Sequence, residues 1–309
     1  MNGLIEMDFQ SLTKDNLEDI YELFKDNEPF YSIPLEYFRN GTLNDEAYNP
    51  EMTLILINEE TKKPISALLA VIRKGLIRKN CYIKALIVDK NYRRQGIGSK
   101  MLEEIILRAK RKLQWGASIF YGDSRPNYWQ PGVDLRHTSL FFFFKKHGFK
   151  THRMRYNLTV LLKNIENIPK NIIEQYSFSR IQPEDFKKTY EFVKKQFPIG
   201  FWAEEVQLSY KNNPPTTFIA KDLNNEIVGW ATHSNLFPGS FGPTGVLKAL
   251  RGKGIGGELL SWCIWDMKQN GLETCTILWV VGDTIKFYSK VLGAYIHPVF
   301  YPMGKKLLH

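Results

Sequence analysis

The sequence predicts an α/β fold in two similar domains, each of which mixes strands and helices in the same order. The main observation is a phrase, Arg-x-x-Gly-x-Gly, that occurs twice, at residues 93–98 and 251–256. The second observation is what flanks the phrase: in both copies an apolar run typical of a strand precedes it, and an amphipathic helical pattern follows it. The third observation is length, because 309 residues suit two domains of ordinary size. A polar stretch containing Pro169 separates the halves, so we expect domains at residues 1–167 and 168–309.

In the first half, a capped helical pattern near residues 14–25 is followed by β-type runs at 53–57, 65–72 and 82–88. After the glycine turn, one apolar helix face is formed by Met101, Leu102, Ile105 and Ile106. A strand at 117–121, a helix at 140–146 and a final strand at 153–161 complete the half.

The second half repeats this order. It restarts with a short strand, a capped turn and a helix start at 178–186, and strands at 217–220 and 228–232 flank a turn-forming run. The helix after the second glycine turn has an apolar face made of Leu259, Leu260, Cys263, Ile264 and Met267. A strand at 275–281, a helix at 284–292 and a strand at 294–301 follow.

Composition favours a globular protein of a reducing compartment. Hydrophobic residues make up 43% of the chain and charged residues 24%. Three scattered cysteines argue against a disulfide framework or a Cys-rich zinc site, so we expect a cytoplasmic protein without a metal. The N-terminus lacks a secretory pattern and no run of about 18 apolar residues occurs, so no membrane partner is expected. The net charge of +10 is dispersed without a nucleic-acid motif, so a nucleic-acid partner is not favoured.

Each glycine turn predicts an anion site. Glycine lets the backbone approach a ligand closely, and the N–H groups that open a helix have no intrahelical acceptor. Together with the positive end of the helix dipole, they suit a pyrophosphate. The residues expected to hold it are Arg93, Arg94, Gln95, Gly96, Ile97, Gly98 and Ser99 in the first half, and Arg251, Gly252, Lys253, Gly254, Ile255, Gly256 and Gly257 in the second.

Two other phosphate motifs fit less well. Residues 252–257 formally contain the dinucleotide fingerprint Gly-x-Gly-x-x-Gly, but the first copy has Met101 in place of the third glycine. Neither copy opens a βαβ unit, as that fingerprint should. A Walker A loop needs Gly-Lys-Ser/Thr after four intervening residues, which neither copy supplies.

The order of these features resembles the acetyl-CoA-dependent N-acetyltransferase (GNAT) superfamily, here as a tandem pair with a layout similar to mycothiol synthase. A strand ending in valine, the Arg-x-x-Gly-x-Gly turn, a helix, a strand and an aromatic-Lys-(x)-x-Gly element carry the resemblance. It implies acetyl-CoA (CoA) as co-substrate, with its pyrophosphate on the turn. Its pantetheine arm would lie along the strand edge at Ile87 and Val88, and at Gly245 and Val246. The implied acceptor is the amine of a small molecule or a peptide N-terminus.

Direct acetyl transfer to an amine needs a neutral amine, donors for the carbonyl oxygen and an acid for the departing thiolate. In the superfamily that acid is often a tyrosine on the helix before the last glycine. The second half offers Tyr288 near this position, whereas the first half has Phe144, which carries no hydroxyl. We therefore expect the second half to be catalytic, with Tyr288 as acid and His233 as base or water relay. Other candidates for the base are Glu204, Glu205 and Asp283.

Two segments are expected near the acceptor. The insertion at 121–134, which the second half lacks, either lines the cleft mouth with Tyr128 and Trp129 or shields the domain interface. Tyr121 and Tyr128 are also candidates for the hydroxyl missing at Phe144. Aromatic groups at 29–34 and 197–202 fall where acceptor contacts lie in such folds, although core filling also explains their rings.

Two functions of other classes stay open. One is a regulator or pseudo-enzyme that binds CoA without chemistry, which Phe144 motivates. The other is a tRNA-dependent aminoacyl transferase of the Fem type, which also pairs two such domains and is basic. Two intact pyrophosphate turns argue against the latter.

Overall fold

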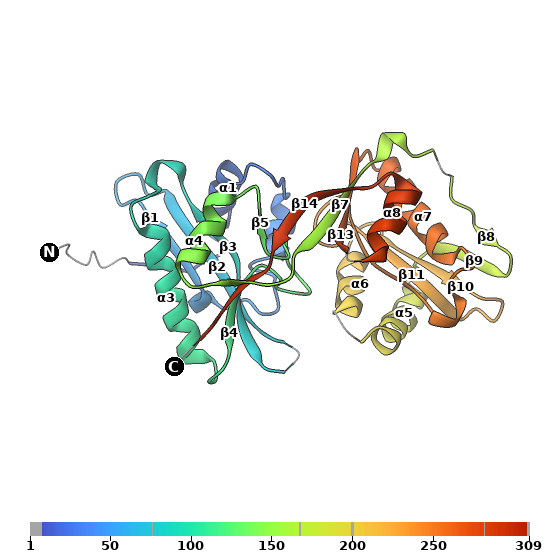
Figure 1. The fold of residues 1–309 in the computed structure, drawn as a ribbon, viewed down its shortest axis with the longest axis horizontal. Helices are drawn as coiled ribbons and strands as arrows, with labels where there is room; N and C mark the ends of the chain where they lie inside the picture. Colours follow the sequence, from blue (N-terminus) through green and yellow to red (C-terminus); the bar gives the residue numbers. More distant parts are fainter. Residues whose placement is uncertain (1–7, 76, 167, 199–200, 281, 308–309) are drawn as a thin grey trace. The chain divides into compact units, whose positions relative to one another are not determined.

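The structure, a computed structural model, describes residues 8–75, 77–166, 168–198, 201–280 and 282–307. The chain forms two compact units (Figure 1), one of Met1–Met154 with Phe300–His309 and one of Arg155–Val299. Each unit is a mixed α/β domain, which confirms the predicted fold class.

The sheet of the first unit has the strand order β1-β2-β3-β4-β15-β6. Its strands are β1 (Thr53–Ile57), β2 (Pro64–Lys74), β3 (Lys79–Val88), β4 (Ser118–Tyr121), β6 (Lys150–Thr151) and β15 (Met303–Lys306). Its helices are α1 (Leu17–Asn27), α2 (Leu35–Asn40), α3 (Ile97–Lys112) and α4 (Thr138–Lys146). A short strand, β5 (Val133–Asp134), pairs with Phe300 and Tyr301. Strands β3 and β4 are parallel, whereas β1, β2 and β3 pair antiparallel.

Two apolar cores lie on opposite faces of this sheet, and a break in the register of β3 against β2 at Lys84 moves its odd-numbered residues from one face to the other. Cys81 and Ile83 point into the core that contains the buried face of α3. Ala85 and Ile87 point into the core that contains α1 and Phe38 of α2. The helices therefore cover both faces, and the site described below lies where the sheet opens between them.

The second unit repeats this plan, with the strand order β14-β7-β13-β12-β11-β10-β9-β8. Its strands are β7 (Arg155–Leu161), β8 (Ile172–Ile173), β9 (Tyr176–Arg180), β10 (Thr217–Lys221), β11 (Ile227–His233), β12 (Ser240–Val246), β13 (Thr274–Val280) and β14 (Tyr295–Tyr301), whose last two residues belong to the first unit. Its helices are α5 (Pro183–Gln196), α6 (Trp202–Tyr210), α7 (Ile255–Gln269) and α8 (Asp283–Leu292). Residue 281, the last of one expected strand, and residues 199–200 of the second aromatic group lie outside the described residues.

Each unit completes its sheet with a strand from the other half of the sequence. Strand β7, expected to end the first half, pairs antiparallel with β13, with Val160 opposite Cys275. The C-terminal strand β15 pairs with β4, with Gly304 opposite Phe120, and Figure 1 shows it beside β4. The compact units therefore divide differently from the expected boundary at residues 167 and 168, because strand pairing between distant segments leaves no local pattern. The limits 1–167 and 168–309 remain a prediction about the repeated unit.

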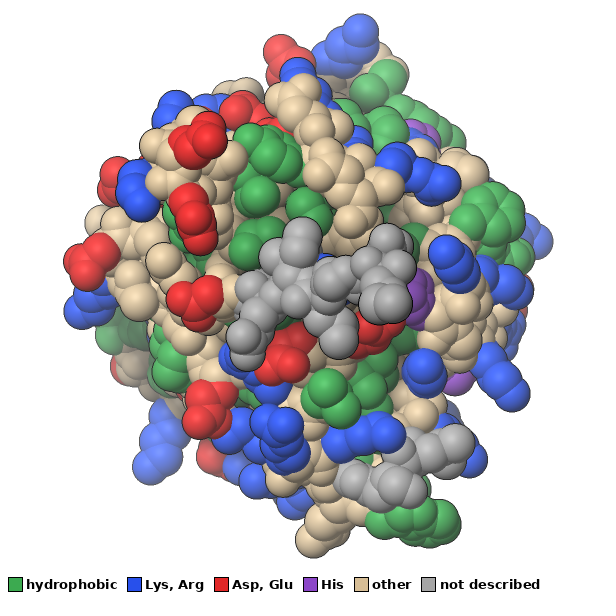
Figure 2. Space-filling model, turned by 90° about the vertical axis from the view of Figure 1, so that its left-hand side faces the viewer, with side chains coloured by type: hydrophobic (Ala, Val, Ile, Leu, Met, Phe, Trp, Pro, Cys, Tyr) green, Lys and Arg blue, Asp and Glu red, His purple; other side chains and the backbone are tan. Residues whose placement is uncertain are grey.

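The basic end of α3 is partly neutralised. Arg108 donates to Glu104 at 2.7 Å, and Lys112 pairs with Glu51. On the face shown in Figure 2, basic side chains are interspersed with acidic and apolar ones.

In the described part of the chain, no helix has both the length and the apolar character needed to cross a bilayer.

Candidate active site

The two glycine turns have the same backbone conformation. Gly96 and Gly254 precede α3 and α7 with φ of 84° and 82°, in the left-handed region that favours glycine. Within the described residues, the backbone N–H groups of 96–99 and 254–257 donate to no protein acceptor. A Cβ on Gly96 or Gly254 would meet nothing within 4 Å, so both turns are open to a ligand. This geometry fits a pyrophosphate at each helix N-terminus.

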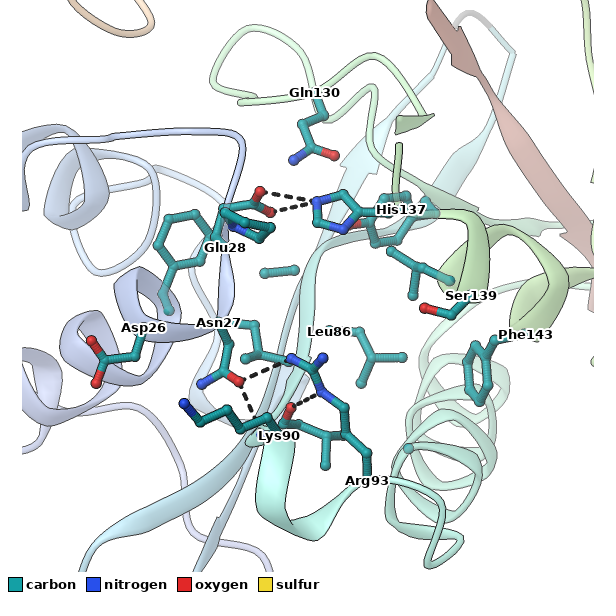
Figure 3. A pocket seen from close by; sticks show the side chains of 18 of the residues that line it. Asp26, Asn27, Glu28, Leu86, Lys90, Arg93, Gln130, His137, Ser139 and Phe143 are labelled. Carbon is teal, nitrogen blue, oxygen red and sulfur yellow. Dashed lines mark hydrogen bonds and ion pairs between the residues drawn. The ribbon is translucent and has the colours of Figure 1, made fainter. Parts of the chain in front are cut away.

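The first arginine of each motif fastens the turn to the preceding strand. Arg93 Nε donates to the carbonyl oxygen of Val88 at 2.9 Å, and Arg251 Nε donates to that of Val246 at 3.4 Å. The spacing of five residues in both copies therefore has a structural cause. Arg93 also donates to Asn27 at 2.9 Å, as Figure 3 shows.

Beside each turn the sheet opens. The last pair between β3 and β4 is Ile83 with Tyr121, and the last between β12 and β13 is Phe241 with Ile277. The register of β3 against β2 shifts so that Lys84 has no partner in the ladder, which is a β-bulge at the point of divergence. Beyond it, residues 84–88 present an edge free of β4, which suits an extended arm of acyl-CoA.

The opening in the first unit is a cavity of about 460 Å³. It adjoins a hollow of about 680 Å³ at the glycine turn, and both are lined by Val88, Arg93 and Gly98. The cavity thus runs from the phosphate turn to the end of α1 and to the inserted loop. Its other polar lining residues include Glu28, Lys84, Tyr121, Gln130, His137 and Ser139.

A carboxylate and an imidazole meet in this cavity. Glu28 follows α1, His137 precedes α4, and His137 Nε2 lies 2.9 and 3.0 Å from the two carboxylate oxygens of Glu28. Figure 3 shows this pair between the α1 loop and the start of α4, with the Gln130 amide pointing toward it. Gln130 is 7% exposed, and its Oε1 has no hydrogen-bond partner among the described residues. A carboxylate–imidazole pair, which can accept a proton, and the amide oxygen of Gln130 therefore line one cavity. Deprotonation of an amine needs a base of this kind.

Neighbouring contacts hold the two loops that carry this pair. Asp134 is fully buried and accepts from the Tyr31 hydroxyl and from Arg136, at 2.7 Å from Nη2. Burial raises the pKa of Tyr31, and the charge of Asp134 adds to this effect. The Arg136 guanidinium lies 4.4 Å from the centre of the Phe30 ring. The aromatic group at 29–34 and the inserted loop thus position the cavity wall.

The second unit has a cleft of about 360 Å³ at the equivalent place. Tyr288 lines it together with Gly245, Val246, Arg251 and Gly256. The pKa of Tyr288 is raised because the side chain is buried. Aromatic side chains narrow this cleft, namely Phe197, Trp202, Phe241 and Phe287.

The structure separates the other sequence-based candidates from the cavities. His233 is buried against α7, where its Nε2 lies 2.9 Å from Asp266, and it lines none of the described cavities. Arg180 donates to the same carboxylate, so His233 belongs to a buried polar cluster. Glu204, Glu205 and Asp283 also line none of these cavities. Most of the residues predicted for the first turn line the first unit's cavity or the adjoining hollow. Of the residues predicted for the second turn, Arg251 and Gly256 line the cleft of the second unit.

The expected tyrosine position needs a correction in the first unit. Phe144 is fully buried and packs against Tyr121 and Phe149 in the core. Phe143 faces the cavity instead. It precedes Gly148 by five residues, which is the same spacing as that of Tyr288 before Gly293. One helical turn earlier, Ser139 lines the cavity and supplies a hydroxyl.

Sequence reasoning missed Glu28, His137, Lys84 and Ser139. Glu28 precedes the aromatic group and His137 follows the insertion, and both segments were expected near the acceptor. Nothing in the local pattern pairs two residues 109 positions apart.

Comparison with known proteins gives one family and a set of similar folds. The profile of the Acetyltransferase (GNAT) family matches residues 17–125 and 182–294. No curated protein matches the sequence.

Among solved structures, a GCN5-related glucosamine N-acetyltransferase region of a fungal multi-domain GH3 β-N-acetylglucosaminidase has a TM-score of 0.74 at 17% identity. That match covers 98% of this chain and 38% of the fungal chain. A GCN5-related N-acetyltransferase from Sphaerobacter thermophilus has a TM-score of 0.67 at 16% identity, covering 98% of this chain and 96% of that one. A tandem GNAT protein from the clavulanic acid biosynthesis pathway has 0.68 at 15%, covering 98% and 99%. At these identities the likeness extends to the fold alone.

Proposed function

The chain belongs to the acetyltransferase (GNAT) family, and from this premise we propose that it transfers an acetyl group from acetyl-CoA to a primary amine in the first unit. The observation that carries this proposal is the Glu28–His137 pair in a cavity that also reaches the first glycine turn. The sequence favoured the second half. We prefer the first because the described lining of the second cleft offers Tyr288 and Arg251 as its titratable groups, without a carboxylate or imidazole.

The residues of this chain divide the work as follows. The amides of 96–99 would hold the pyrophosphate and the free edge of β3 the pantetheine arm of acetyl-CoA, which supplies the activated acyl group. The Glu28–His137 pair takes the proton that the amine loses as its nitrogen bonds to the carbonyl carbon. Ser139, which lines the same cavity, would give a proton to the sulfur as the carbon–sulfur bond breaks.

The second unit would bind acyl-CoA at its own turn, with Tyr288 as the corresponding acid. Chemistry in this unit is the second candidate, because the Tyr288 side chain lines the cleft beside Val246. We also retain a reducing, cytoplasmic location as a proposal, since Cys81, Cys263 and Cys275 are buried free thiols.

The test measures CoA release from acetyl-CoA with a panel of primary amines, together with calorimetric binding of acetyl-CoA. Amino sugars belong in the panel because one structural neighbour is described as a glucosamine N-acetyltransferase region. Myristoyl-CoA serves as the alternative donor, because a Saccharomyces cerevisiae N-myristoyltransferase with bound myristoyl-CoA shares the fold at a TM-score of 0.65.

Glu28→Gln and His137→Gln should each lower kcat by about 10²- to 10⁴-fold, the range of general base catalysis, with acetyl-CoA binding unchanged. Glu22→Gln, on the exposed side of α1, is the matched control and should leave kcat unchanged. Full activity in both site variants, with loss in Tyr288→Phe, would move the chemistry to the second unit. No CoA release by the intact chain with bound acetyl-CoA would favour a regulator, and no binding would revive the Fem-type alternative.

A further inference from the structure

A buried cluster of two cations and one carboxylate borders the cavity that contains Glu28 and His137. Lys84 is 7% exposed and lines the cavity at the β-bulge of β3. Its Nζ donates to Asp45 at 2.5 Å, and Arg73 donates to the same carboxylate oxygen. The other oxygen of Asp45 accepts from the backbone N–H of Ala47 at 2.8 Å. Two cations thus share one carboxylate.

Among the described hydrogen bonds, Asp45 is the one carboxylate that accepts from Lys84 and Arg73. Arg73 Nε donates to the neutral hydroxyl of Ser124 at 3.1 Å. The Lys84 ammonium carries three protons, and the described contacts use one of them for a hydrogen bond. The ring of Trp129 lies 5.7 Å from Nζ, a cation–π contact that is weaker than pairing with an anion. A buried cation without its own anion is costly, and a ligand carboxylate would offset this cost.

Burial of Lys84 supports the same conclusion. It lowers the pKa of the ammonium to about 8, in spite of the neighbouring Asp45. Near neutral pH the group still carries its proton, but it is held in surroundings that favour its loss. An anion bound beside Lys84 would favour the protonated form and raise this pKa again.

The cavity lining therefore carries two chemically different sets of groups. Glu28, His137 and the free oxygen of Gln130 suit an amine, and Lys84 suits an anion. We propose that Lys84 binds a carboxylate of the acceptor, so that the acceptor is an amino acid or an amino-acid-like molecule with a primary amine and a carboxylate. This inference rests on the proposed function and names its substrate class.

The test uses matched acceptors that differ only in the carboxylate: amino acids and ω-amino acids against their carboxamides. CoA release is measured for the full chain and for Lys84→Met, which keeps an unbranched stem without charge. The wild type should prefer the acid, and Lys84→Met should lose about 10- to 100-fold in kcat/KM for the acid, the effect of one charged hydrogen bond. The rate with the carboxamide should fall much less than the rate with the acid, and Lys84→Arg should keep the preference for the acid.

Calorimetric binding of acetyl-CoA serves as the folding control for each variant. An equal loss for acid and carboxamide in a variant that still binds acetyl-CoA would overturn the proposal, because it would assign Lys84 a role independent of the carboxylate. A wild type that acetylates carboxamides or amino sugars as well as the acids would overturn it too, while leaving the proposed function intact. Absence of CoA release with every amine would instead contradict the proposed function.

Discussion

A carboxylate placed in either glycine turn should weaken acetyl-CoA binding at that turn and leave the other turn unaffected. The substitutions are Gly96→Glu and Gly254→Glu, with Gly96→Gln and Gly254→Gln as controls of the same shape. Both side chains have room, because a Cβ at either position meets nothing within 4 Å. Both also carry the same cost of a left-handed backbone, about 1–2 kcal/mol. The difference between Glu and Gln therefore isolates the charge.

The size of this difference follows from Coulomb's law. A carboxylate about 5 Å from two pyrophosphate charges in solvent costs about 1.7 kcal/mol before screening. At 10 mM salt, screening leaves about 1.4 kcal/mol, or a Kd about 10-fold higher, and at 1 M salt the effect falls below about 2-fold. Calorimetric titration of acetyl-CoA at both salt concentrations gives the comparison. Equal Kd values for the Glu and Gln variants of one turn at 10 mM salt would refute a pyrophosphate site there.

Three further predictions concern other parts of the chain. Burial lowers the pKa of His233, so below about pH 6.5 the unfolded chain binds a proton that the folded chain resists, and stability falls as the pH decreases. The melting temperature should therefore drop between pH 7.5 and pH 5.5, and by less in His233→Gln; an equal drop in both proteins would contradict this. Phe144→Ala should cost about 3–5 kcal/mol in a urea titration, because the ring is fully buried, whereas Phe143→Ala should cost less; equal costs would count against the assigned orientations. Tyr288→Phe should leave the rate of amine acetylation within about 2-fold, and a larger fall in kcat would place chemistry in the second unit.

Much of each domain could be predicted from local pattern. The strand 53–57 was expected with the bounds that β1 has, and the helix face through Met101 and Ile105 is the buried face of α3. Such segments are legible because apolar residues recur with the period of the element. The short helix α2 was not predicted, since six residues give too little periodicity.

The candidate site was predictable only where one segment supplies it. The glycine turns come from consecutive residues, and the structure gives both copies the conformation that an anion site needs. The Glu28–His137 pair joins loops from opposite ends of the first unit's sequence, so no local pattern announces it. The choice between Phe143 and Phe144 depends on the rotation of α4 about its axis, which a run of four phenylalanines leaves undetermined.

The sequence by itself determined the duplicated α/β plan, the family resemblance and the two turns, because periodicity, glycine spacing and repetition are local properties. Tertiary structure alone decided which distant groups share a cavity, that His233 belongs to a buried cluster with Asp266, and that Lys84 lines the same cavity as Glu28 and His137. It also decided that β7 and β15 complete the sheets of the opposite halves. These features arise from pairing and packing between segments far apart in the chain, where the free energy of burial, not local propensity, selects the partners.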